Sequence, residues 1–147
     1  TGSMVEFNVT VDGCPMATQR ADGVIVSTAT GSTAYAMAAG GPILHPALSA
    51  MVLVPVAPHT LTNRPIVLPA TSTIDITLIA AREASIYCDM QDFVPMKKGD
   101  TLRISSMARS FTILHPSDHN HYRTLREKLY WNLMPTDNNP QVPIKEG

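Results

Sequence analysis

A run of small, hydroxyl-bearing residues with one glycine, Ser27 to Thr33, holds the groups best suited to contact a ligand. It follows the apolar stretch Val24 to Val26 and precedes an alanine-rich stretch, which is the order of a strand, a loop and a helix. The first N–H groups of a helix and the positive end of its dipole attract anions, and Gly31 lets a ligand approach the backbone. The run lacks the lysine of a Walker loop and does not fit GxGxxG. The residues alone therefore indicate either a site for an anionic or sugar-phosphate ligand or a capped helix start.

Three histidines near the C-terminal end, His115, His119 and His121, are the other group whose residue type could do chemistry. A structural zinc site takes four ligands in a tetrahedron, and no thiolate or close pair of carboxylates accompanies these imidazoles. We therefore expect surface histidines and no metal site.

The elements that must position the hydroxyl run begin with a strand. Val5 to Val11 alternates between apolar and polar residues, which predicts a half-buried strand. Asp12-Gly13 predicts a turn, and a partner strand is expected around residues 15–20. The apolar run Val24 to Val26 predicts a short strand that is buried on both faces.

Two helices are predicted. Good helix formers from Thr33 to Ala39 indicate a short helix with Ser32 or Thr30 as its N-cap, and Gly40-Gly41-Pro42 ends it. Residues 120–132 form an amphipathic pattern, which predicts a second helix.

Most of the remaining chain has the composition of short strands, separated by Pro, Gly and Asp. Many short strands of this kind favour an antiparallel sandwich or barrel-like sheet over a doubly wound fold. The predicted strands are Met51–Val56, Arg64–Leu68, Thr73–Ile79, Ser85–Cys88 and Thr101–Ser105.

Composition excludes several classes of protein. The chain has 147 residues, 44% of them hydrophobic, and a formal net charge of -1, which excludes a protein held mainly by nucleic-acid phosphates. No apolar run approaches the roughly 18 residues that span a bilayer. The two cysteines, Cys14 and Cys88, form no CxxC pair, which favours a reducing compartment. We expect a cytoplasmic protein that binds neither nucleic acid nor membrane.

Read as a string, the sequence resembles the NAD kinase family of proteobacterial type. The family's diagnostic motif is similar to DGVIVSTATGSTAY at residues 22–35 and AGGPI at 39–43, although Ala29 replaces its usual proline and Ala38 a common serine. Further resemblance covers nearly the whole chain, in PHTLTNRPIVLP at 58–69, CDMQ at 88–91, LHP at 114–116 and YRTLREKLYW at 122–131.

The resemblance implies a mainly β fold, that of the family's C-terminal β-sandwich-like domain, with a short helix after the TGSTAY loop and a C-terminal helix. Residues 1–134 would form this domain and 135–147 a flexible tail. The family's N-terminal α/β domain carries a GGDGT loop, whose Asp is the base, and a later Asn-Glu pair grips the substrate. Neither motif occurs in this sequence. We expect a fragment without the catalytic α/β domain and without a catalytic residue of its own.

The resemblance also implies a dinucleotide site. Asp22 would accept hydrogen bonds from an amide or ribose group, as a carboxylate can, and Arg20 would share its face of a strand. The start of the short helix would line the site, with Tyr35 reaching across a subunit boundary. The implied NAD-binding residues are Arg20, Asp22, Thr33, Ala34, Tyr35, Ala36, Met37, Ala38, Ala57, His59 and Gln91.

The function implied by the resemblance is transfer of the γ-phosphoryl group of ATP to the adenosine 2'-hydroxyl of NAD, with Mg²⁺ expected in the whole enzyme. The chain would supply the NAD-holding surface and an interface of a homo-oligomer, dimer or tetramer, and would be inactive alone. The alternative is a non-catalytic nucleotide-binding or assembly module. A GGDGT motif upstream in the same reading frame of the encoding DNA would discriminate the two.

Overall fold

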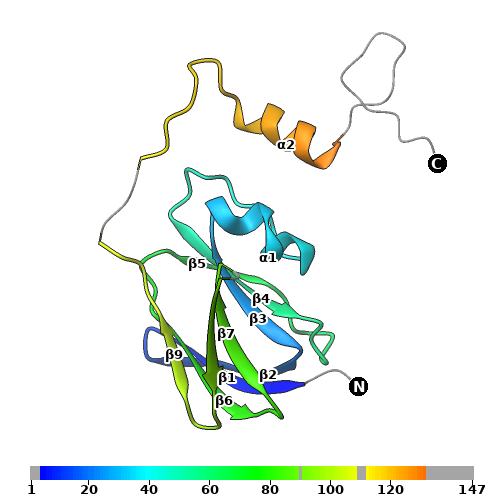
Figure 1. Cartoon of the computed structure of the whole chain (residues 1–147), viewed down its shortest axis with the longest axis vertical. Coiled ribbons are helices and arrows are strands. Elements are labelled where there is room, and N and C mark those ends of the chain that lie inside the picture. The colour runs from blue at the N-terminus through cyan, green and yellow to red at the C-terminus, as the bar shows by residue number, and fades with distance from the viewer. Residues whose placement is uncertain (1–3, 90, 109–111, 132–147) are drawn as a thin grey trace, which may run out of the picture. The chain divides into compact units, whose positions relative to one another are not determined.

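The computed structural model describes residues 4–89, 91–108 and 112–131, and Figure 1 traces the whole chain. The chain divides into two compact units, residues 1–108 and 109–147. Among the described residues, every strand lies in the first unit, and the second unit contains a helix. The predicted tail 135–147 lies outside the described residues.

The first sheet is antiparallel and has the strand order β2-β1-β6-β9. Its hairpin turns at Asp12-Gly13, where both residues have positive φ, and the Asp12 carboxylate accepts a hydrogen bond from the backbone N–H of Thr73 at 2.8 Å. The predicted hairpin and the alternating strand near residue 75 are confirmed. The bounds are β1 Val5–Val11, β2 Cys14–Ala21, β6 Ile74–Ala80 and β9 Thr101–Ile104.

The second sheet has the order β3-β4-β5 and is also antiparallel. It consists of β3 (Gly23–Thr28), β4 (Ala50–Val56) and β5 (Ile66–Pro69). The prediction that residues 24–26 are buried on both faces is wrong, because β3 is an edge strand and is only half-buried. The central strand β4 is the one that is buried on both faces, since residues 51–55 are all buried.

A separate hairpin pairs β7 (Ala84–Cys88) with β8 (Asp92–Met96). The sequence reading missed β8, because an aspartate and Pro95 lie within its five residues. Proline cannot donate a hydrogen bond to a ladder and is tolerated where no neighbouring strand needs that donor, as in an edge strand.

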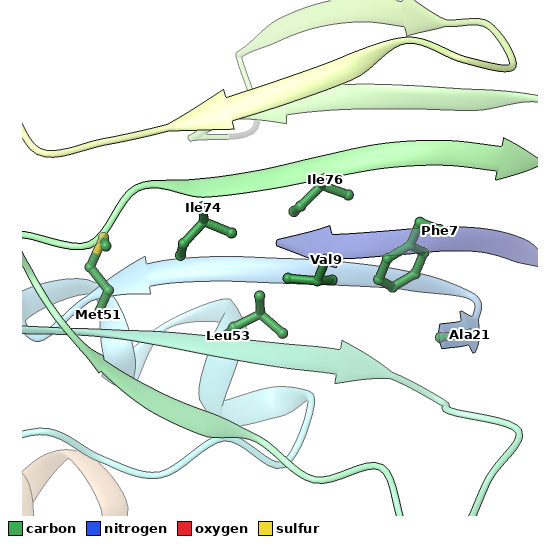
Figure 2. Packing of buried hydrophobic residues seen from close by; sticks show 7 residues of the cluster. All are labelled: Phe7, Val9, Ala21, Met51, Leu53, Ile74 and Ile76. Atoms are coloured by element: carbon green, nitrogen blue, oxygen red, sulfur yellow. The ribbon is translucent and has the colours of Figure 1, made fainter. Parts of the chain in front are cut away.

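The core lies between the two sheets. Phe7 and Val9 of β1 and Leu53 of β4 are almost fully buried, and Figure 2 shows side chains from both sheets meeting in one layer. Burying each such side chain contributes about 1.5–3 kcal/mol. The buried cluster consists of Phe7, Val9, Ala21, Met51, Leu53, Ile74 and Ile76. This packing confirms the sandwich-like arrangement.

The second unit contains α2 (His121–Leu129). The side chain of Asn120 caps it by accepting a hydrogen bond from the backbone N–H of Arg123 at 3.0 Å. The helix ends three residues earlier than predicted, at a C-cap formed by Tyr130 in the left-handed conformation. Within the described part of the chain, no helix has the length and hydropathy that a bilayer crossing requires.

Candidate functional site

The TGSTAY segment folds as two short helical pieces. A 3₁₀ helix, η1 (Thr30–Thr33), is followed by the α-helix α1 (Tyr35–Ala38). One continuous helix over residues 33–39 was expected, and that prediction is wrong, because the backbone of Ala34 leaves the helical region between the two pieces. An α-helix of four residues has only a small dipole, so an anion site at this point cannot rest on that dipole.

The two helical pieces cover the outer face of the second sheet. Ala29 and Ala36 pack with Val52 and Val54 of β4 in a second buried cluster, which Leu44 completes. Figure 1 shows α1 lying over β3 and β4. Small side chains suit this position, because they let the backbone of the segment lie close to the sheet.

The predicted site residues of this segment differ in exposure. Tyr35 is 62% exposed, and Ala34 and Ala38 are also exposed. Thr33 and Met37 are half-buried, whereas Ala36 is buried in the second cluster, and its backbone carbonyl accepts a hydrogen bond from Gly41. The side chain of Ala36 therefore packs against the sheet, and Tyr35 presents the largest exposed surface of the segment.

The expected capping by Ser32 or Thr30 does not occur. The residue before η1 is Ala29 and the residue before α1 is Ala34, and neither makes a side-chain capping bond. The hydroxyl of Ser32 instead donates to the carbonyl of Ala29 and accepts from the backbone N–H of Leu44. A buried hydroxyl bonds whatever backbone groups surround it, and the chain beyond α1 supplies one of them.

A second set of predicted residues gathers where the chain passes from the first sheet to the second. This junction group consists of Arg20, Asp22, Ala57 and His59. The backbone N–H of Asp22 donates to the carbonyl of Val56 at 2.9 Å, and that of His59 donates to the carbonyl of Arg20 at 3.0 Å. These two bonds hold the loop after β4 against the end of β2.

The side chains of the junction group face solvent. Nε2 of His59 lies 4.0 Å from Oδ1 of Asp22, and both side chains are half exposed. A carboxylate has two oxygens with about four acceptor positions, so the contact with His59 leaves Asp22 with capacity for a ligand donor. Nε of Arg20 lies 3.2 Å from Oε2 of Glu6, and the arginine is the more exposed of that pair. The group therefore offers an exposed anionic acceptor at Asp22 and an exposed cationic donor at Arg20.

Ala57 shapes the loop of the junction group. Its φ is 45°, which lies in the left-handed region that non-glycine residues occupy at a cost of roughly 1–2 kcal/mol. The turn at Ala57 comes directly after Val56, the last residue of β4, and leads the chain to His59. The backbone of this loop is therefore held in a strained turn where a ligand contact was predicted.

Gln91 lies elsewhere, in the turn between β7 and β8, where its backbone N–H donates to the carbonyl of Cys88 at 3.0 Å. Among the described residues, no hydrogen bond or ion pair links it to the junction group. The structure thus brings four of the predicted residues together at the junction and six in the helical segment, and it leaves Gln91 on a separate hairpin.

Comparison with known proteins decides the family. The family model described as ATP-NAD kinase C-terminal domain matches residues 1–115. The chain belongs to the NAD kinase family. It is 54% identical over 136 residues to the NAD kinase of Cupriavidus pinatubonensis and 53% identical to that of Ralstonia nicotianae, covering 92% of this chain and 45% of each relative. The chain therefore spans about half the length of these relatives.

Solved NAD kinase structures share the fold. The yeast NADH kinase complexed with NADH matches with a TM-score of 0.77 and 25% identity, over 91% of this chain and 42% of that one. An NAD kinase from Archaeoglobus fulgidus in complex with ATP matches with a TM-score of 0.63 and 33% identity, over 70% of this chain and 40% of that one. The mainly β architecture expected of the family's C-terminal domain is confirmed.

Sequence reasoning missed the ion pair of Glu6 with Arg20 in this NAD kinase domain. Alternation in β1 places Glu6 on the face opposite Phe7 and Val9, but its partner depends on the register of the hairpin. The hairpin contains an irregularity near Val9, and the sequence carries no clear signal for it. The ion pair with Arg20 therefore became visible only in the structure.

Two of the histidines near the C-terminal end lie against each other. The rings of His115 and His119 stack with centroids 3.8 Å apart and an interplanar angle of 5°. Across residues 4–89, 91–108 and 112–131, no three His, Cys, Asp or Glu side chains gather as a metal site would require.

Proposed function

We propose that this chain is the dinucleotide-holding part of an NAD kinase, which transfers the γ-phosphoryl group of ATP to the adenosine 2'-hydroxyl of NAD and yields NADP. Its membership of the family supports the reaction class. The complexes of its structural relatives with NADH and with ATP support these two substrates. The observation that carries the proposal for this chain is the junction group. In it, backbone hydrogen bonds bring residues that are distant in sequence close to the exposed carboxylate of Asp22.

Each residue of the junction group has a role in this proposal. The carboxylate of Asp22 accepts hydrogen bonds from an amide or ribose group of the dinucleotide. The guanidinium of Arg20 donates to an oxygen of the ligand, and His59 adds a donor or acceptor beside Asp22. The turn at Ala57 sets the distance of His59 from the other two.

The helical segment supplies a second surface for the dinucleotide. Thr33, Ala34, Met37 and Ala38 line it with their backbone and small side chains, while Ala36 contributes through its backbone because its side chain packs inward. Tyr35 is exposed and free to stack on a ring or to bond across a subunit boundary. Gln91 contacts the dinucleotide from the β7–β8 hairpin.

The chain supplies binding and positioning rather than a catalytic residue. Phosphoryl transfer depends on holding donor and acceptor in line and on neutralising the charge that develops, which Mg²⁺ does in related reactions. Mg²⁺ in such sites is usually held by one or two carboxylates together with substrate phosphates and water, and the proposal assigns it to no residue of this chain. The base and the triphosphate loop belong to a GGDGT-bearing domain. The assembled enzyme is a cytoplasmic homo-oligomer.

A chimaera tests this function. The 147-residue chain replaces the matching region of the Cupriavidus pinatubonensis relative, and NADP formation is compared for the chimaera, the chain alone and the relative. We expect the chimaera to form NADP and the chain alone to bind NAD weakly and form none. NADP formation by the chain alone would overturn the division of labour. A folded chimaera that forms no NADP and a chain that binds no NAD would favour an assembly module instead.

A further inference from the structure

Ser32 is enclosed completely, with no exposed surface, at the centre of the TGSTAY segment. Its Oγ donates to the carbonyl of Ala29 at 2.7 Å and accepts from the backbone N–H of Leu44 at 2.9 Å. The first bond closes the η1 turn. The second crosses twelve residues of sequence to the chain that returns beyond α1. One hydroxyl therefore ties the start of the helical segment to the chain beneath its end.

A second contact holds the returning chain in the same place. The backbone N–H of Gly41 donates to the carbonyl of Ala36 at 2.8 Å. A Cβ atom on Gly41 would lie 2.7 Å from both that carbonyl oxygen and Cγ2 of Val54. The returning chain is thus wedged between α1 and β4, and Leu44 packs in the second buried cluster. Residues 41–44 form a fixed base for the helical segment.

The chemistry of position 32 admits few side chains. A serine hydroxyl offers one donor and two acceptor positions, and this one uses the donor for Ala29 and an acceptor position for Leu44. Alanine would leave the backbone N–H of Leu44 without its bond, which is the costly way to remove a hydrogen bond, whereas the carbonyl of Ala29 would keep the bond from the backbone N–H of Ser32 at 3.3 Å. Threonine would add a methyl group where the side chain already has no exposed surface.

We propose that Ser32 is a positioning residue for dinucleotide binding, acting through the backbone of Thr33–Ala38 without contacting the ligand. This inference rests on the proposed function, because that function makes the segment a dinucleotide-binding surface. Ser32 fixes the segment from below while Tyr35 and Ala38 face outward. Its hydroxyl is buried and already forms hydrogen bonds with two backbone groups. It therefore fixes the conformation of the segment and does not bond the ligand.

The test compares Ser32→Ala with Ile76→Val, a matched loss of core packing in the cluster between the two sheets. NAD affinity is measured by calorimetry on the 147-residue chain at a temperature where both variants are folded, and backbone amide exchange is followed at Leu44. We expect Ser32→Ala to weaken NAD binding about tenfold, a factor that 1.4 kcal/mol produces, and to speed exchange at Leu44. Ile76→Val should lower the melting temperature and change neither readout.

Other outcomes separate the two proposals. Weaker NAD binding with unchanged exchange at Leu44 would indicate direct ligand contact and overturn the inference, as would unchanged affinity in folded Ser32→Ala. If Ser32→Ala does not fold, Ser32→Cys takes its place, because a thiol keeps a weaker donor and acceptor, and it should show the same changes at smaller size. If the unsubstituted chain binds no NAD, the proposed function fails, and exchange at Leu44 alone then decides whether Ser32 holds the segment.

Discussion

Glu6 faces Arg20 across the β1–β2 hairpin because a β-bulge shifts the register between Val9 and Thr10. Near the turn, Val11 pairs with Cys14 and Thr10 pairs with Pro15. If this register continued along the hairpin without a bulge, Gln19 would lie opposite Glu6. Met16 is the extra residue, and beyond it Val9 pairs with Ala17, so Arg20 moves opposite Glu6. The same shift turns Gln19 toward the core beside Phe7, where it is 5% exposed. A bulge of this kind re-aims side chains near functional sites.

Removing the charge of Glu6 tests what this pair does. Exposed ion pairs contribute a median of about 0–1 kcal/mol, so Glu6→Gln should change the free energy of unfolding by less than about 1 kcal/mol. Because the guanidinium of Arg20 loses its ion-pair partner at Nε, we expect NAD affinity to fall by a factor of roughly two to five, which lies within that same energy range. Urea denaturation and calorimetric titration measure the two effects. A loss of stability well above this range with unchanged affinity would make the pair purely structural.

Asp22 provides the sharpest test of the junction group. Asp22→Asn keeps the shape of the side chain and removes its charge, and hydrogen bonds to charged groups contribute about 1.5–3 kcal/mol. We therefore expect NAD binding to weaken by at least about tenfold. Glu83→Gln is the matched control, because it removes one exposed negative charge outside the junction group. Equal affinity for Asp22→Asn and the unsubstituted chain would remove Asp22 from the site.

The sheets were predictable from sequence where one face of a strand is buried. Val5–Val11 and Ile74–Ala80 alternate because only one face of each reaches the core, and their bounds follow within a residue or two. Residues 24–26 and 51–55 are both apolar runs, and composition cannot reveal which strand lies at the centre of a sheet. That distinction depends on strand order, which is a property of the folded chain.

The candidate site was predictable as a set of residues but not as a geometry. The resemblance to a family supplied Arg20, Asp22 and His59, and the structure shows that two backbone hydrogen bonds bring them together. The role of Ser32 could not be predicted from the sequence. A hydroxyl residue before a helix has the same local pattern whether it caps the helix or forms a hydrogen bond with a distant backbone group. The N–H that it binds belongs to Leu44, which no spacing rule connects to it.

Gly41 should be sensitive to the smallest possible substitution. In Gly41→Ala the new Cβ would meet a backbone oxygen of Ala36 and a methyl of Val54 at 2.7 Å, and overpacking of this kind costs about 1–3 kcal/mol. Gly23→Ala is the matched control, because nothing lies within 4 Å of its added Cβ and its φ is not in the left-handed region. Urea denaturation should show a clear loss for the first variant and no loss for the second. Equal stability of both would contradict the close packing of the returning chain.

The stability of the first sheet should depend on pH through one cross-strand pair. Arg103 of β9 donates from Nε and Nη2 to the two carboxylate oxygens of Asp75 on β6, at 2.8 and 2.9 Å. These hydrogen bonds hold the pKa of Asp75 below its ordinary value of 3.8, against a smaller upward effect of desolvation, and they raise the pKa of Arg103. A carboxyl whose pKa is lowered by folding stabilises the fold above its unfolded pKa and loses that contribution as the pH falls through its folded pKa.

Asp75→Asn therefore should be less stable than the unsubstituted chain at neutral pH, by an amount that stays constant down to about pH 5 and shrinks below the ordinary pKa of 3.8. The difference in the free energy of unfolding, measured by urea denaturation between pH 7 and 3, gives this curve. Arg103→Lys serves as the companion variant, because lysine keeps the charge but cannot form the two parallel bonds, and it should reproduce part of the loss. A difference that is as large at pH 3 as at pH 7 would show that Asn fails for a reason other than charge, since the Asp75 carboxylate of the unfolded chain, with its ordinary pKa of 3.8, would by then be taking up its proton.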